Sequence, residues 1–238
     1  MVALGDLASL QKKGTQKTLD ALTQLLNYSA TQTNANVLFL RSRMILHIHI
    51  DSSYLLAPKA CSHAGGHFFF SSNTANPDKY SPNGPVHVIS KILCNVMGSA
   101  AETEVGASYI NGQEAIPLRQ ALEEMGHPQP PTPIQVDNTF AVGFTNGIVK
   151  QKISKAIDMR FYWIQDWSKQ GQFIIYWQPG TQNVVYYHTK HHSPAHHRQM
   201  RPTYLHETET LANNLISKLL RGGVNPVSSG RACVRWQP

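Results

Sequence analysis

Three carboxylates in this 238-residue chain lie where they could bind metal ions. Asp51 ends a predicted strand in the stretch LHIHIDSSY, Glu104 lies in the first turns of a predicted helix, and Asp137 ends a second predicted strand, IQVD. Strand ends and helix starts are where α/β folds place their sites. Oxygen ligands suit hard divalent cations, and two such ions about 4 Å apart activate water in phosphodiester hydrolysis. The three acids therefore predict a site for Mg²⁺ or Mn²⁺.

Two neighbouring glutamates have to be distinguished at the start of that helix. The stretch SAAE at 99–102 predicts a capping box, with Ser99 as the N-cap and Glu102 at the third helical position. Glu102 thus has a structural role, whereas Glu104 has none and is the better candidate ligand. The alternative that Asp51, Glu104 and Asp137 are ordinary solvated or capping residues stays open on spacing alone.

The elements that position these acids follow from the hydrophobic pattern. Residues 46–51 alternate between apolar and polar types, which predicts a strand with one apolar face. Strands are expected at 44–51, 65–72, 86–93, 134–137 and 172–180. Helices are expected at 16–30, 99–126 with a kink at Pro117, 138–145, 154–169 and 209–221. The first three strands indicate an antiparallel meander, and the whole order predicts a mixed α/β sheet with helices packed on it.

Composition narrows the classes of partner and compartment. The net charge of +7 suits a polyanion, nucleic acid first, although a merely basic protein is the alternative. The sequence contains no run of 18 apolar residues, so it predicts no membrane span. The N-terminal stretch is too polar for a signal peptide. The three cysteines form no CxxC pair, so no disulfide framework is indicated. We therefore expect an intracellular protein.

Five stretches carry a family resemblance. In chain order they read HIDSSY, SAAETEVGA, IQVDN, SKAIDMRFYWIQDWSKQGQFIIYW and HTKHH, within roughly residues 16–206. They resemble the RNase H domain of copia-type LTR retrotransposon polyproteins, and the N-terminal segment looks like the part that joins reverse transcriptase to that domain. The resemblance implies an RNase H-like fold, a five-stranded mixed sheet flanked by helices. The expected segments are a connection helix at 1–36, the RNase H-like domain at 37–206, and a C-terminal helix and tail at 207–238.

The same resemblance implies an activity and its residues. It implies hydrolysis of the RNA strand of RNA–DNA hybrids by a two-metal mechanism, in the cytoplasm, the nucleus or a retroelement particle. Asp51, Glu104 and Asp137 take the places of the family's first three catalytic acids and metal ligands, which matches the interpretation from the residues. A basic run, Lys150, Lys152 and Lys155, is a candidate for phosphate contact, with a solvated face as the alternative.

One position departs from the family. Its members carry a fourth acid shortly after the last strand, and here the corresponding stretch reads NVVYYHTK, with Tyr186 at the position of the acid. A phenol with a pKa of about 10 is a poor Mg²⁺ ligand at neutral pH. Two hypotheses follow: a ribonuclease weakened by this loss, or a catalytically inactive fold recruited as a nucleic-acid-binding or structural subunit. The tail after residue 207 would suit the docking of a protein partner.

Overall fold

The computed structural model describes residues 1–57, 60–72, 83–94, 96–147, 159–180, 183–207 and 231–233. The chain forms two compact units, each described by itself. The sheet unit spans Ser42–His191, together with Met1, and the terminal unit combines Val2–Arg41 with His192–Pro238. These units have other bounds than the three expected segments, whose borders at residues 36 and 206 stay a prediction.

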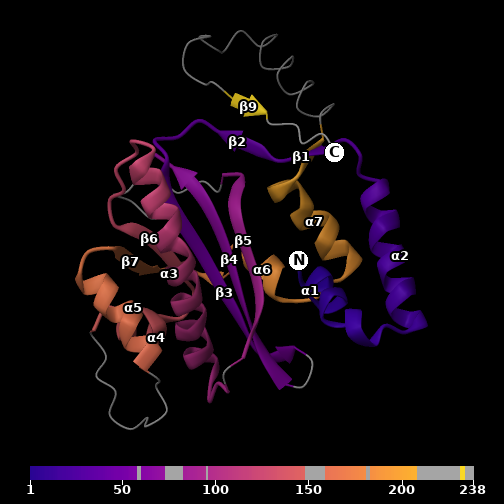
Figure 1. Cartoon of the computed structure of the whole chain (residues 1–238), viewed down its shortest axis with the longest axis horizontal. Coiled ribbons are helices and arrows are strands. Elements are labelled where there is room, and N and C mark those ends of the chain that lie inside the picture. Colours follow the sequence, from indigo (N-terminus) through magenta and orange to yellow (C-terminus); the bar gives the residue numbers. More distant parts are fainter. Residues whose placement is uncertain are drawn as a thin grey trace. The chain divides into compact units, whose positions relative to one another are not determined.

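A five-stranded mixed sheet forms the centre of the sheet unit (Figure 1). Its strands are β3 (Ile45–Ala57), β4 (Cys61–Ser71), β5 (Pro85–Leu93), β6 (Thr132–Val136) and β7 (Phe173–Trp177). They lie in the order β5-β4-β3-β6-β7. The first three strands pair antiparallel as a meander, and β6 and β7 join parallel to β3. This order and these directions confirm the predicted RNase H-like fold.

The strand that carries Asp51 is longer than expected. We predicted that it ends at Asp51, but β3 continues to Ala57 and pairs with β4 on both sides of that residue. The stretch SSYLLA has mixed polarity and gives no strand signal of its own. It forms a strand because β4 begins at Cys61 and pairs with it. The helix start was predicted more closely, since Ser99 caps α3 (Ala100–Glu124) and accepts a hydrogen bond from the Glu102 N–H.

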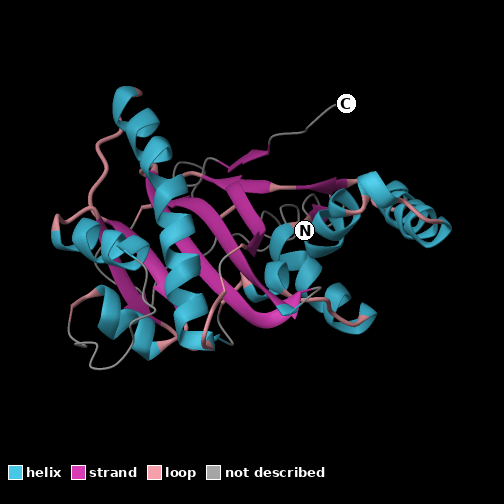
Figure 2. Cartoon of the chain, turned by 60° about the horizontal axis from the view of Figure 1, so that its bottom comes forward, coloured by secondary structure: helices cyan, strands magenta, loops and turns pink. Residues whose placement is uncertain are grey.

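Helices cover both faces of the sheet. Figure 2 shows α3 lying across the strands, and α3 contacts both α4 (Thr139–Thr145) and α5 (Met159–Lys169). α3 continues through Pro117 without interruption. On the other face, the single turn α6 (Tyr186–Thr189) contacts β3, β4 and β5. The predicted helices at 16–30, 99–126 and 138–145 are thus confirmed, and the one at 154–169 is described from Met159 onward.

Both faces of β3 are buried, not only the apolar one. Leu46, Ile48 and Ile50 belong to the core beneath α3, and each is fully buried. The opposite face carries His47 and His49, which are also buried and lie against the ring of Phe69. Two glycines let helices approach this central strand pair. A Cβ on Gly65 would lie 2.5 Å from the Thr189 methyl of α6, and one on Gly66 would lie 1.7 Å from the Asn111 amide oxygen of α3.

The terminal unit is built from short elements of both chain ends. These are α1 (Val2–Ser9), the 3-10 helix η1 (Gln11–Lys13), α2 (Gln16–Ala30), β1 (Ala35–Asn36), β2 (Leu38–Leu40), α7 (Pro194–Tyr204), β8 (His206–Glu207) and β9 (Arg231–Cys233). β1 pairs with β8, and β2 pairs with β9. A capping box between Thr15 and Thr18 starts α2. The predicted helix at 209–221 and most of the tail lie outside the described residues.

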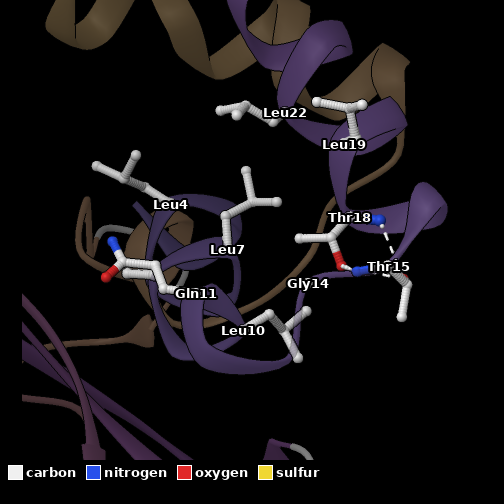
Figure 3. A pocket seen from close by; sticks show the side chains of 10 residues that line it. Leu4, Leu7, Leu10, Gln11, Gly14, Thr15, Thr18, Leu19 and Leu22 are labelled. Carbon is white, nitrogen blue, oxygen red and sulfur yellow. Dashed lines mark hydrogen bonds between the residues drawn. The ribbon is translucent and has the colours of Figure 1, made fainter.

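An apolar pocket of about 470 Å³ lies between α1, η1 and α2 (Figure 3). Leucines such as Leu4, Leu7 and Leu22 line it, and it contains none of the predicted site residues. None of the helices in the described part of the chain combines the length and the apolar content that a bilayer-spanning segment requires.

Candidate functional site

Asp51 lies where the parallel half of the sheet comes to its end. β3 pairs with β6 at Ile48–Ile134 and His49–Gln135, and continuing this register brings Asp51 level with Asp137, just past the last residue of β6. On its other edge, Asp51 is paired with Gly65 of β4. Asp51 therefore borders the carboxyl end of β6 although it lies inside its own strand.

The Asp51 side chain is buried against α6. It is 2% exposed, and the Thr189 hydroxyl donates a hydrogen bond to its Oδ2. Burial raises the pKa of Asp51 from its ordinary 3.8 to about 6, and the nearby Asp137 carboxylate adds to this. The Thr189 hydrogen bond and the Lys190 ammonium act in the opposite direction. A carboxylate in this position gains from any cation that approaches it.

Glu104 reaches the site from the opposite face of β3. It lies in the second turn of α3, is 3% exposed, and accepts a hydrogen bond of 2.5 Å from the Ser52 hydroxyl at its Oε2. Its Oε1 is buried and has no hydrogen-bond partner. Burial raises the pKa of Glu104 from 4.5 to about 8, and Asp51 and Asp137 raise it further by charge repulsion. An acceptor left unpaired inside a protein costs free energy, which a bound cation would recover.

Asp137 is the most open of the three acids. It directly follows β6 and is half-buried. Its backbone carbonyl accepts a hydrogen bond of 3.0 Å from the Trp177 indole at the end of β7. Its carboxylate lies beside Gly180, where a Cβ would come within 2.7 Å of Oδ2. The end of β7 and the loop after it therefore fix where this side chain lies.

The structure brings the three predicted acids into electrostatic range of one another. The carboxylates of Asp51 and Asp137 both raise the pKa of Glu104 by charge repulsion. Within the described ranges, however, no three His, Cys, Asp or Glu side chains gather closely enough to form a metal-ligand cluster. The acids are thus neighbours across the end of β6 and not a closed cage. Their chemistry, with one buried oxygen unpaired, fits a hard divalent cation.

Tyr186, which takes the place of the resembled family's fourth acid in the sequence, is the first residue of α6. Tyr186 is 39% exposed, and the Lys190 ammonium lies 3.8 Å from the centroid of its ring. Asn183 anchors the turn before α6, because its amide donates a hydrogen bond of 2.5 Å to the Ile50 carbonyl of β3.

Several residues of the site were not predicted. Ser52 and Thr189 hold the two buried acids by hydrogen bonds, and Lys190 lies beside them. Thr189 and Lys190 carried a sequence signal, since they match the family pattern, whereas nothing distinguished Ser52. The predicted phosphate contacts Lys150, Lys152 and Lys155 lie outside the described residues.

Comparisons with known proteins give distant structural likenesses. No protein-family model matches the chain, and no curated protein matches it either. Among solved structures, an RNase H1 isolated from compost by a metagenomic approach is similar at a TM-score of 0.41 and 13% identity, over 59% of this chain and 88% of that one. The same protein in complex with an RNA/DNA hybrid is similar at a TM-score of 0.36 and 12% identity, over 58% of this chain and 88% of that one. An RNase H1 from the halophilic archaeon Halobacterium salinarum is similar at a TM-score of 0.33 and 11% identity, over 59% of this chain and 89% of that one. The fold assignment itself rests on the order and directions of the strands.

Proposed function

We propose that this chain is an RNase H-like domain of copia-type retroelement origin that hydrolyses the RNA strand of RNA–DNA hybrids, weakly and with Mg²⁺ or Mn²⁺. The observation that carries the proposal is the pair Asp51 and Glu104. Both carboxylates are almost fully buried at the end of β6, and Glu104 keeps one oxygen without a hydrogen bond. Burying a carboxylate costs the fold free energy, and a bound cation would offset that cost.

Each residue of the candidate site would have its own role. Asp51, Glu104 and Asp137 would hold a divalent cation, which when bound lowers the pKa of its water and stabilises charge on the phosphate. The Ser52 hydroxyl holds one oxygen of Glu104, and the other oxygen has no hydrogen bond. The Thr189 hydroxyl holds Asp51 from the opposite face. Both buried side chains are thereby fixed before any ligand arrives, which reduces the cost of ordering them on binding.

One observation at Tyr186, the position of the resembled family's fourth acid, favours a second function. The resembled family has a carboxylate at the position of Tyr186, whereas this chain has an aromatic ring with the Lys190 ammonium 3.8 Å from its centroid. This arrangement suits a catalytically inactive RNase H-like subunit that binds nucleic acid or has a structural role. A protein partner for the tail after residue 207 and an intracellular location belong to either function as predictions from the sequence.

Hybrid cleavage and hybrid binding, measured together, test the proposal. The purified chain is incubated with a labelled RNA–DNA hybrid in Mg²⁺ and in Mn²⁺, beside the Asp51→Asn variant and single-stranded RNA. We expect slow cleavage of the hybrid alone, abolished in Asp51→Asn, and binding in both proteins that weakens steeply as salt rises, because phosphate contacts release counterions. Binding without cleavage in either metal would favour the inactive subunit. The absence of both at 50 mM salt would refute the nuclease and the nucleic-acid-binding subunit, and would leave only the structural role.

A further inference from the structure

We propose that Lys190 is a tethered counter-cation of the Asp51–Glu104 site and competes there with the divalent cation, an inference that rests on the function proposed above. The lysine would thus set how much metal the site needs. It would also neutralise the buried acids when metal is scarce.

The geometry fixes Lys190 at the site through its neighbours. Lys190 is the C-cap of α6, directly after Thr189. The Thr189 hydroxyl donates to Asp51 Oδ2 and lies 3.2 Å from the Tyr186 carbonyl oxygen, so the turn that carries Lys190 is tied to a carboxylate of the site. Gly65 permits this close approach, because any side chain there would collide with Thr189 and Val185. The backbone of Lys190 therefore cannot move far from Asp51.

The side chain of Lys190 is held by the ring of Tyr186 on the same turn. Its Nζ lies 3.8 Å from the centroid of the Tyr186 ring, within the range of a cation–π contact. In the sequence, Tyr186 takes the place of the resembled family's fourth acid, so the ammonium lies over the residue that replaces it. Lys190 is half-buried, which reduces the screening of its charge by water.

The electrostatics agree with this geometry. The Lys190 ammonium lowers the pKa of Asp51 and that of Glu104, against the much larger opposite effect of burial. Its charge therefore reaches both acids, one on each face of β3. A divalent cation bound between these acids would be repelled by the same ammonium, since both positive charges favour the same ionised carboxylates. Binding of the metal and retention of Lys190 at the site oppose each other.

Removing only the charge of Lys190 separates this role from packing. Lys190→Met keeps the length of the side chain and its contact with the Tyr186 ring, and Lys190→Arg keeps the charge. The matched control is Lys169→Met, an exposed lysine at the end of α5 that is not among the charges acting on Asp51 or Glu104. The probe is Mn²⁺ alone, titrated into each full-length protein at pH 7.5 and followed by electron paramagnetic resonance of the free ion. Melting in EDTA and in saturating Mn²⁺ is measured beside it.

We expect Lys190→Met to bind Mn²⁺ about ten-fold more tightly than the wild type, equivalent to about 1.4 kcal/mol. Lys190→Arg and Lys169→Met should stay within two-fold of the wild type. In EDTA, Lys190→Met should melt at a lower temperature than the wild type, because the buried acids lose their countercharge, and saturating Mn²⁺ should remove this difference. A lysine with a merely structural role would lower the melting temperature equally in both conditions and leave the affinity unchanged.

The Asp51→Asn variant separates failure of this inference from failure of the proposed function. If the wild type binds Mn²⁺, Asp51→Asn does not, and Lys190→Met binds no more tightly than the wild type, the role of Lys190 is refuted while the metal site stands. If Lys190→Met binds Mn²⁺ and the wild type does not, the inference is supported in its strongest form. If neither protein binds Mn²⁺, both the inference and the metal-dependent function are wrong.

Discussion

Replacing Glu104 with glutamine measures what the buried carboxylate costs the fold. Burial raises the pKa of Glu104 from 4.5 to about 8, so the unfolded chain releases this proton at a lower pH than the folded one. The stability associated with the protonated side chain is fully present below pH 4.5 and is lost as the pH rises towards 8. A pH of 7 lies about 2.5 units above the pKa of this group in the unfolded chain. At about 1.4 kcal/mol per unit, the folded state is therefore destabilised by roughly 3 kcal/mol at pH 7.

Glutamine keeps the shape of the side chain and avoids this cost. Its amide oxygen can accept the Ser52 hydrogen bond, which is 2.5 Å long in the wild type. In EDTA we expect Glu104→Gln to raise the free energy of unfolding by roughly 3 kcal/mol at pH 7, by roughly 5 kcal/mol above pH 8, and by almost nothing at pH 4. Urea denaturation at the three pH values measures these differences. Glu124→Gln, at the exposed end of the same helix, is the control and should stay within about 0.5 kcal/mol.

The pH profile is what decides the result. A gain of equal size at pH 4 and pH 8 would show that the carboxylate charge is not its source, and a loss at every pH would show that Glu104 makes a contact that glutamine cannot replace. Either outcome would refute the reasoning. Added Mg²⁺ should stabilise the wild type and leave Glu104→Gln almost unchanged, because the ion binds the ionised carboxylate.

Two further substitutions test the fourth position and the support of the sheet. Tyr186→Asp should raise Mg²⁺-dependent hybrid cleavage at least ten-fold by supplying a missing ligand, and because position 186 is 39% exposed it should unfold at nearly the wild-type urea concentration. No gain in cleavage by a stably folded Tyr186→Asp would favour the inactive subunit. Arg119→Met should lower the free energy of unfolding by about 2–4 kcal/mol in urea, because the guanidinium donates to the Pro130 carbonyl at 2.7 Å and to Thr132 Oγ1 at 2.6 Å beside β6. A loss below about 0.5 kcal/mol would show that these hydrogen bonds are replaced by water.

The fold could be predicted from the sequence because its signals are local. The alternation of polar and apolar residues marked β3, and the Ser99 cap marked the start of α3. The far end of β3 could not be found in this way. Its last residues have mixed polarity and become a strand only because β4 begins early enough to pair with them, as Ala57 does with Cys61. Such pairing depends on a partner elsewhere in the chain.

The sequence predicted the three acids of the candidate site but not the residues that donate hydrogen bonds to them. Asp51 could be noticed because it follows an apolar alternation, and Glu104 because Glu102 already has the capping role. Ser52 and Thr189 have no such signature, since their roles come from the two faces of β3 meeting α3 and α6. The burial of His47 and His49 escaped for the same reason: α6 covers that face from a distant part of the sequence.

The two buried acids are supported unequally, and this points to where a cation would have most effect. Asp51 lies against an element that donates a hydrogen bond to it and carries a lysine, so part of the cost of its burial is already offset. Glu104 receives one hydrogen bond, and its other oxygen has none. A ligand that contacts Glu104 Oε1 therefore relieves more unfavourable free energy than one that contacts Asp51 alone. Strand β3 separates the two side chains, so they cannot satisfy each other. Asp137, at the end of β6, acts on both acids through its charge, and a cation beside Asp137 would therefore lie within electrostatic range of both.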